Sequence, residues 1–217
     1  LTVTDKNGKE VKLTEKNGKY TFTMPASKVT VTATFMDDNT MLNFFVDVKA
    51  SDYYYDAVLW AAQNGITSGT DAVHFTPDGV CSRAQAVTFL WRAAGSPAPK
   101  SASMPFTDVP KGSYYYDAVL WAVENGITEG TSDTTFSPDA DCTRAQIVTF
   151  LWRSQKSPAA GTANPFADVK STAYYASAVL WAVKENITKG TTNTTFSPDA
   201  DCTRAQIVTL LYRAYVK

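Results

Sequence analysis

"FTDVPKGSYYYDAVLWAVENGITEGTSDTTFSPDADCTRAQIVTFLWR" (residues 106–153) is one of three near copies of the same phrase. The other two copies occupy residues 45–92 and 166–213. Similarity at a fixed spacing indicates one supersecondary unit per copy, and such a unit is too small to bury its apolar face alone. We therefore expect the three copies to pack together into one body.

Two helices joined by a turn-rich loop are predicted in each copy. In the first copy a helix is expected from about Tyr53 to Asn64, because apolar residues recur there with helical spacing. A left-handed C-cap should follow, formed by glycine in two copies and by Asn186 in the third. The second helix should begin after Ser82 or its threonine equivalents, with a glutamine completing a capping box. These glutamines are Gln85, Gln146 and Gln206.

Segments rich in proline, alanine and serine separate the copies and are typical of linkers. We place the repeats at residues 43–95, 104–155 and 164–217. Residues 1–36 differ, because short alternating stretches surround the turn signals Asn7-Gly8 and Asn17-Gly18 and so predict β-hairpins. The fold class is therefore mainly α, with three helix-loop-helix repeats after a short β-segment that ends a preceding module.

The composition is that of a globular protein, with 44% hydrophobic and 19% charged residues. A formal net charge of -1 gives no general attraction to nucleic acid or to an anionic membrane. The longest apolar runs fall far short of the roughly 20 residues that span a bilayer, so no membrane span is expected. The chain opens with Leu1 and without a signal-peptide pattern, and we expect it to be a piece of a longer protein.

Three cysteines occupy the same point of each copy: Cys81, Cys142 and Cys202. A metal cluster on a three-fold axis is conceivable, but no histidine or second cysteine lies near any of them in the sequence. We favour small buried side chains, because free cysteine is among the most buried residue types. No cofactor is expected.

An arginine occupies the first position of each second helix: Arg83, Arg144 and Arg204. The helix dipole disfavours a cation there, and the helical pattern turns the side chain toward the buried face. A buried guanidinium needs an anionic partner. One alternative is an internal carboxylate, either in the acidic loop before the helix or in the Phe-x-Asp-Val openings. The opening aspartates are Asp47, Asp108 and Asp168.

The other alternative for the arginine partner is an external anion. It would be held by the guanidinium and by the N–H groups of the helix start. Tryptophans on the first helix raise a similar choice, because they fall outside its predicted core face. They either pack against a neighbouring unit or offer a flat surface to a sugar. These residues are Trp60, Trp121 and Trp181.

Catalysis is not expected from this sequence. No nucleophile elbow, P-loop, zinc motif or EF-hand loop is present. The single histidine, His74, has no counterpart in the other copies. Binding modules gain avidity from repetition, whereas enzymes rarely repeat an active site within one small chain. The sequence therefore favours a binding module.

The chain resembles the S-layer homology family. The resemblance rests on the Phe-x-Asp-Val opening, the Gly-Ile-x-x-Gly turn, the Phe-x-Pro and the Thr-Arg-Ala-(Glu/Gln) helix start, repeated in order over about residues 43–217. It implies a pseudo-three-fold body with the second helices in a central bundle and grooves between the lobes. The β-segment resembles the tail of small β-repeats that precede such modules in bacterial surface proteins.

The resemblance also implies a function. The family binds secondary cell-wall polysaccharide non-covalently, often through pyruvylated amino sugars, and holds exported proteins on Gram-positive-type cell surfaces. The family arginine maps onto Arg83, Arg144 and Arg204, which favours an external carboxylate. The arginines and tryptophans, with Gly69, Gly130 and Gly190 of the turn, should line the ligand sites, supported by the aspartates and glutamines named above. The alternative is a module that pairs with other surface-layer subunits without binding glycan.

Three departures from the family pattern stand out. Glutamine replaces the usual glutamate of the helix start, and cysteine replaces the usual isoleucine or valine before it. The third copy has Asn186 for the turn glycine and Ser177 for the helix aspartate. The groove that involves the third copy is therefore expected to be altered.

Overall fold

The computed structural model describes residues 2–16, 19–32, 44–100 and 103–216. The chain divides into two compact units, Leu1–Met41 and Leu42–Lys217. The first unit carries the strands and the second carries the helices. This division matches the change of character that the sequence predicts after the β-segment.

The N-terminal unit contains two antiparallel strand pairs in its described part. β1 (Thr2–Asp5) pairs with β4 (Val29–Thr32), and β2 (Thr14–Lys16) pairs with β3 (Lys19–Thr21). The pairing of β2 with β3 agrees with the predicted hairpin. The turn at residues 7–8 does not join two full strands, because β1 pairs along its length with β4 instead. Residues 33–36 of the expected β-segment lie outside the described residues.

Each repeat supplies the two predicted helices. The first helices are α2 (Tyr55–Gln63), α4 (Tyr116–Glu124) and α6 (Ala176–Lys184). The second helices are α3 (Arg83–Ala93), α5 (Arg144–Ser154) and α7 (Arg204–Tyr215). In the part of the chain that the structure describes, no helix has both the length and the apolar character needed to cross a bilayer. The mainly α fold class is confirmed.

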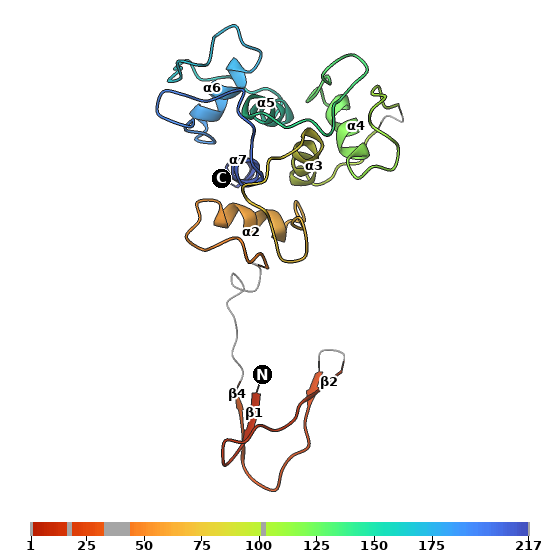
Figure 1. Ribbon diagram of the computed structural model, residues 1–217, viewed down its shortest axis with the longest axis vertical. Helices are drawn as coiled ribbons and strands as arrows, with labels where there is room; N and C mark the ends of the chain where they lie inside the picture. The colour runs from red at the N-terminus through yellow and green to blue at the C-terminus, as the bar shows by residue number, and fades with distance from the viewer. Residues whose placement is uncertain (1, 17–18, 33–43, 101–102, 217) are drawn as a thin grey trace. The chain divides into compact units, whose positions relative to one another are not determined.

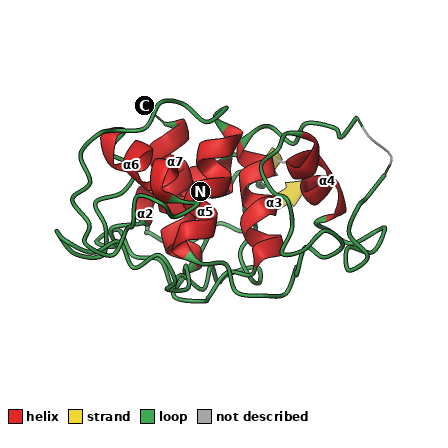
Figure 2. Cartoon of the chain, turned by 90° about the horizontal axis from the view of Figure 1, so that it is seen from above, coloured by secondary structure: helices red, strands yellow, loops and turns green. Residues whose placement is uncertain are grey.

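The first helix of each repeat packs mainly against the second helix of another repeat. α4 lies against α3, and α6 lies against α5 (Figure 1). The ring closes because α2 of the first repeat lies against α7 of the third. α3, α5 and α7 also contact one another at the centre. The expected pseudo-three-fold body with a central bundle is therefore confirmed, and Figure 2 shows its loops along both sides of the helical layer.

The caps that delimit these helices follow the sequence. In α5 the side chain of Thr143 accepts a hydrogen bond from the N–H of Gln146 at 3.3 Å, and the Gln146 side chain accepts one from the N–H of Thr143 at 3.2 Å. The same capping box begins α3 and α7. The predicted left-handed C-caps are also confirmed, with φ of 66°, 64° and 58° at Gly65, Gly126 and Asn186.

A ring of backbone hydrogen bonds joins the three repeats at the cysteines. The N–H of Cys81 donates to the carbonyl of Cys202 at 3.0 Å, that of Cys142 to Cys81 at 2.8 Å, and that of Cys202 to Cys142 at 2.9 Å. The three thiols are free and fully buried. Among the described residues, no group of histidines, cysteines and acids could hold a metal ion. The prediction of small buried side chains is confirmed.

These thiols are expected to be unreactive in the folded protein. Burial raises the pKa of Cys81 and of Cys202 to about 12, although Arg204 and Arg144 respectively act against it. Because the thiolate is the nucleophile, Ellman's reagent at pH 8 should react roughly a hundredfold more slowly with the folded protein than with the protein in urea. Rapid labelling without denaturant would show that the centre of the ring opens readily.

Candidate functional site

The three arginines lie at the first turn of the central helices, as predicted, and they are buried. Arg83, Arg144 and Arg204 are 3%, 7% and 5% exposed. Burial lowers the pKa of each arginine, and the opening aspartate of the repeat that it faces acts against this. Because the ordinary pKa of arginine is above about 12, all three guanidinium groups remain charged.

Each guanidinium reaches into the next repeat around the ring. Nε of Arg144 donates to the carbonyl oxygen of Phe196 at 2.8 Å, and its guanidinium carbon lies 4.8 Å from the centre of the Phe196 ring. Arg83 makes the same two contacts with Phe136. Arg204 makes them with Phe75. The carbonyl and the ring partly replace lost hydration, but neither neutralises the positive charge.

The internal carboxylates do not pair with these arginines. Among the described residues, no aspartate or glutamate oxygen lies within ion-pair distance of the three guanidinium groups. Nη2 of Arg83 is buried and has no hydrogen-bond partner. The alternative of direct neutralisation by Asp47, Asp108 or Asp168 is therefore not the arrangement observed.

The opening aspartates instead hold the loop that receives the arginine. Oδ1 of Asp168 accepts a hydrogen bond from the N–H of Phe196 at 2.8 Å, and Oδ2 accepts one from the N–H of Ser197 at 2.7 Å. Burial acts to raise the pKa of Asp168, but these hydrogen bonds and the nearby Arg144 outweigh it, so the pKa lies below its usual value. Asp47 and Asp108 make equivalent hydrogen bonds. The carboxylate thus positions the carbonyl that binds the arginine.

A left-handed residue follows each of these phenylalanines. The φ angles of Thr76, Ser137 and Ser197 are 57°, 57° and 56°. A residue with a side chain adopts this conformation at a cost of about 1–2 kcal/mol. The aspartate accepts a hydrogen bond from the N–H of this same residue, which offsets the cost and fixes the turn.

A groove with a volume of about 390 Å³ opens over Arg144. All three repeats line it, with Tyr53 from the first, Arg144 from the second, and Lys189, Gln206 and Arg213 from the third. Gln206 is the capping-box residue of α7, and Arg213 donates to the carbonyl of Ile187 at 3.2 Å. The groove is therefore complete only when the ring of repeats is closed.

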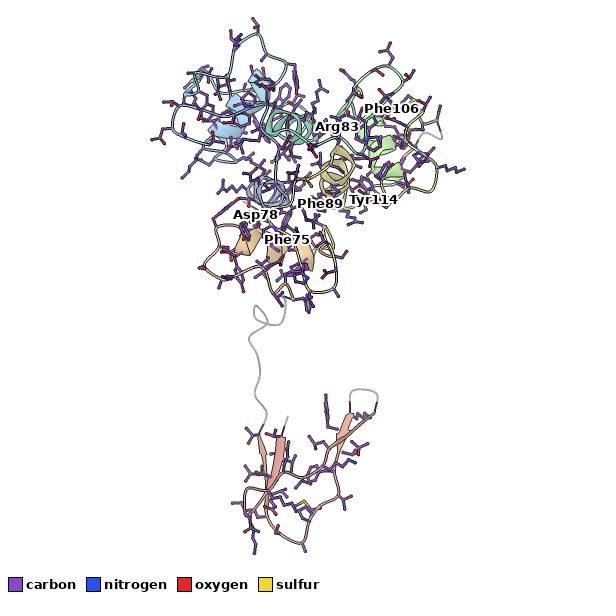
Figure 3. The ribbon with its side chains drawn as sticks, viewed as in Figure 1. Phe75, Asp78, Arg83, Phe89, Phe106 and Tyr114 are labelled. Carbon is purple, nitrogen blue, oxygen red and sulfur yellow. The ribbon has the colours of Figure 1, made fainter. Side chains whose placement is uncertain are left out.

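The repeat symmetry produces two equivalent arrangements. Arg204 is surrounded by residues of the first two repeats, which Figure 3 labels: Phe75, Phe89 and Tyr114. Arg83 is surrounded by residues of the second and third repeats: Phe136, Phe150 and Tyr174. Figure 3 also shows Arg83 on the side of α3 that faces α5, which carries Phe150. Each arginine thus has the same kind of surroundings, with residues from all three repeats.

An exposed tyrosine stands at each groove and was not singled out from the sequence. Tyr53, Tyr114 and Tyr174 are 66%, 60% and 61% exposed. Each packs edge-on against the tyrosine that follows it, with ring centres 5.0 to 5.1 Å apart. The signal that could have identified them is the recurrence of an aromatic pair just before each first helix, where one ring suffices for the core.

The turn glycines allow the loop to approach the core closely. Gly190 lines the groove over Arg144 and has a φ of 83°. A Cβ atom there would collide with the Phe166 ring and the carbonyl of Thr195. Gly69 and Gly130 have the same conformation and the same crowding. These glycines therefore shape the groove rather than contribute side-chain contacts.

Two of the tryptophans lie in the core, and Trp60 is half-buried against it. Trp121 and Trp181 are only 8% and 5% exposed. Trp60 packs against Tyr212 and Tyr215 of α7, with ring centres 5.8 and 6.4 Å apart. Because each first helix packs against a second helix of another repeat, the face that the sequence assigned to solvent is covered. The rings of Trp121 and Trp181 are too buried to stack on a sugar, and Trp60 packs against α7, so the packing alternative describes these contacts.

The N–H groups at the start of the central helices are already occupied. The N–H of Arg144 donates to the carbonyl of Ala200 at 2.9 Å, and that of Ala145 donates to the carbonyl of Pro198 at 2.9 Å. The corresponding groups of α3 and α7 make the same bonds with the repeat that they face. The expectation that these N–H groups help to bind an external anion is therefore corrected, and the guanidinium side chains face the grooves without them.

The substitutions in the third repeat leave its loop intact. Asn186 is exposed and adopts the left-handed conformation of the glycine that it replaces. Ser177 is also exposed. The N–H of Gly190 donates to Thr188 at 3.2 Å, as the N–H of Gly130 does to Thr128. Asn186 and Ser177 therefore leave the fold of this loop unchanged, and the expectation of an altered or idle groove stays a prediction.

Comparison with known families gives three matches to the S-layer homology domain. They cover residues 44–87, 105–148 and 165–208. Together they account for more than half of the chain. Each match contains an opening aspartate, a turn glycine and the arginine of a central helix.

Several curated proteins are similar to this chain over a small part of their own length. The Surface-layer 125 kDa protein of Lysinibacillus sphaericus is 31% identical over 169 residues, which are 76% of this chain and 14% of that protein. The Endoglucanase of Bacillus sp. (strain KSM-635) is 36% identical over 123 residues, 57% of this chain and 13% of that protein. The S-layer protein sap of Bacillus anthracis is 31% identical over 124 residues, 56% of this chain and 15% of that protein. The chain thus spans about a seventh of the length of these relatives.

Proposed function

Because the chain belongs to the S-layer homology domain family, we propose that its grooves bind an anionic polysaccharide of the bacterial cell wall. The family makes the chain a surface-anchoring module that acts outside the cell, at the cell surface. In the finer proposal, the arginines recognise a carboxylate on the sugar, such as that of a pyruvate ketal. The binding is non-covalent and uses no cofactor.

One observation carries this proposal. Arg144 is charged, is 7% exposed, has no carboxylate partner among the described residues, and lines a groove of about 390 Å³. A desolvated cation without a counter-ion is unfavourable. A carboxylate that enters the groove relieves this cost and gains charge-assisted hydrogen bonds from the guanidinium. The arrangement therefore favours an anionic ligand over a neutral one.

The exposed tyrosines supply the flat surface that a sugar needs. Tyr53 lines the groove over Arg144, and 66% of its surface is exposed. Its neighbour Tyr54 supports it edge-on, so the ring is held at the mouth of the groove. A sugar that stacks on this ring buries apolar C–H groups against it. In this proposal Tyr53, Tyr114 and Tyr174 take the role that the sequence suggested for the tryptophans.

The Arg144→Ala variant is expected to bind purified wall glycan at least about tenfold more weakly, because hydrogen bonds between charged groups contribute about 1.5–3 kcal/mol. Co-sedimentation of the protein with the glycan over a range of concentrations measures this. Lys170→Ala is the control, because it removes an exposed positive charge that does not line the groove. Circular dichroism must show that both variants remain folded.

One set of binding results would contradict the proposed role of the arginines. Unchanged binding in the Arg83→Ala, Arg144→Ala and Arg204→Ala variants, and also in the triple variant, contradicts it. If the alanine variants do not fold, the Arg144→Lys variant serves instead, because lysine keeps the charge but loses the bidentate geometry. Its glycan binding should still fall.

Assembly with other surface-layer subunits is the second candidate function. Two of the relatives carry the names surface-layer or S-layer protein, which favours this candidate. Sedimentation velocity without any glycan tests it over a concentration series. Concentration-dependent oligomers, combined with no retention on wall glycan, would favour assembly over anchoring by polysaccharide.

We assign no catalytic step to this module. One relative is named an endoglucanase, but the similarity covers 13% of that protein. Incubation of the chain with wall polymer should therefore release no new reducing ends. Release of reducing ends that tracks with the purified chain would overturn this assignment.

A further inference from the structure

The surroundings of the three arginines differ in packing and charge, and we infer that the groove over Arg144 is the principal site for the anionic sugar. The inference rests on the proposed function, because it takes the ligand to carry a carboxylate. It assigns the weakest affinity to the groove over Arg83. Two features of the chain support this ranking independently. One is the size of the residue that packs beside each guanidinium, and the other is the charge of the loop residue before each turn glycine.

The side chain beside the guanidinium is smaller in the groove over Arg144. The arginines of the other two grooves each lie over a second ring, that of Phe150 at 5.5 Å or that of Phe89 at 5.3 Å. Leu210 occupies the equivalent position next to Arg144 and lines its groove. An aliphatic side chain in place of a ring leaves more of the guanidinium open. Arg144 is accordingly the most exposed of the three arginines.

The hydrogen-bonding capacity left for a ligand also differs. Within the described chain Arg144 donates only through Nε, so both of its Nη atoms remain available. Nη2 of Arg204 already contacts Thr67 at 3.4 Å. Arg83 also donates only through Nε, but its Nη2 is buried, so it is less accessible to a ligand. A carboxylate binds most strongly when two parallel N–H groups reach it. Arg144 is best placed to present them.

The loop residue before the turn glycine changes its charge from repeat to repeat. It is Ser68 in the first repeat, Glu129 in the second and Lys189 in the third, and all three are exposed. The turn itself is the same in each case, with φ of 84°, 86° and 83° at the following glycine. Lys189 lines the groove over Arg144. By the repeat symmetry, Glu129 occupies the corresponding place at the groove over Arg83.

The charges around the groove over Arg144 favour an anion. Lys189 and Arg213 line it together with Arg144. Two acids act on this groove: Asp78, whose negative charge acts on Tyr53, and Asp168, whose negative charge acts on Arg144. This arrangement sets three cations against two carboxylates.

The groove over Arg83 has the opposite bias. The negative charge of Asp199 acts on Tyr174, just as the charge of Asp78 acts on Tyr53. Asp108 acts on Arg83, and Glu129 stands where the third repeat has Lys189, so three carboxylates oppose Arg83 and the symmetry-related Arg153. A charge change at an exposed position alters the binding of an ion modestly, by roughly tenfold for the full reversal from lysine to glutamate.

Isothermal titration with a soluble wall-glycan fragment, whose terminal sugar carries a pyruvate ketal, tests the ranking. The unmodified chain should show one tight site and weaker additional binding. Lys189→Glu should weaken the tight site roughly tenfold, and Glu129→Lys should raise the number of tight sites toward two. Lys170→Glu is the matched control, because it reverses an exposed charge that does not line the groove, and it should change the affinity by less than about twofold.

A second arm tests shape without changing charge. Leu210→Phe introduces the ring that the other two central helices already carry, so the fold should tolerate it. It is expected to weaken the tight site severalfold. An unchanged affinity in this variant, together with an equal loss in Lys189→Glu and Lys170→Glu, overturns the ranking.

Two further results separate the ranking from the proposed function. Three equally tight sites, or a crystal in which limiting fragment fills the groove over Arg83 first, overturn the ranking and leave glycan binding intact. Failure of the unmodified chain to bind either the fragment or the purified wall glycan overturns the proposed function, and the ranking with it.

Discussion

A chain that ends at Thr203, and therefore lacks α7, is expected to lose the cooperative unfolding of the entire helical unit. α7 contacts α3 and α5 at the centre and α2 at the periphery. Ile207, Val208 and Leu211 of this helix are fully buried. Loss of one large buried aliphatic side chain costs about 2–5 kcal/mol. Three such losses approach the total stability of a typical domain, about 5–15 kcal/mol.

Thermal unfolding followed by far-ultraviolet circular dichroism measures this effect. The shortened chain should show reduced helicity and a broad, non-cooperative melt. A chain that lacks residues 1–12 is the control, because those residues belong to the other compact unit, and its helical transition should be preserved. A sharp transition of the chain ending at Thr203, close in temperature to that of the full chain, would mean that the ring does not need to be closed.

Asp168→Asn is expected to destabilise the protein by about 2–3 kcal/mol at pH 7. The carboxylate accepts hydrogen bonds from the N–H groups of Phe196 and Ser197. An asparagine amide has one oxygen and one NH₂ group, so at least one of these N–H donors loses its acceptor. The left-handed conformation of Ser197 also loses its support. Because the Phe196 carbonyl orients Arg144, glycan binding should weaken as well.

The loss of stability in Asp168→Asn should become smaller as the pH falls. The pKa of Asp168 is lowered in the folded state, so its stabilisation is complete above the unfolded pKa of about 3.9 and disappears as the pH falls through the folded pKa. Urea denaturation should therefore show a constant difference between the two proteins from pH 7 to about pH 5, and a shrinking difference below about pH 4.

Asp199→Asn is the matched control for this experiment, because it removes an exposed carboxylate in the same repeat. It should change the free energy of unfolding by less than about 0.5 kcal/mol. A difference between Asp168→Asn and the unmodified protein that stays the same down to pH 2 would rule out the ionised carboxylate as its source.

Much of the local structure could be predicted from the sequence, because it depends on interactions within a few residues. The capping box of Thr143 and Gln146 and the C-cap at Asn186 are set by side-chain chemistry and backbone sterics at those positions. The burial of Arg144 followed from its place on the helical face. The threefold repetition also indicated that the units must share one core.

The partner of each helix could not be predicted in the same way. A helical wheel shows that a face is apolar, but not which helix covers the opposite face. The sequence therefore left two alternatives for Trp60, and the structure shows that it packs against Tyr212 and Tyr215 of another repeat. The N–H groups of Arg144 and Ala145 were expected to be free for the same reason, since their carbonyl partners lie in the next repeat.

The groove residues also divide into those that the sequence could identify and those that it could not. Arg144 and Gly190 could be identified because each is unusual for its own position. Tyr53 and Lys189 could not, since they meet Arg144 only after the first and third repeats come together.

Because α2 packs against α7, the helical unit cannot complete its fold before α7 has been synthesised. During synthesis the chain emerges from its N-terminus, so α2 is made well before α7, its partner in the third repeat. Until then its apolar face has nothing to cover it, and contacts so distant in sequence form late. The helical unit therefore cannot close into its ring before the third repeat has been made, however early the first repeat leaves the ribosome.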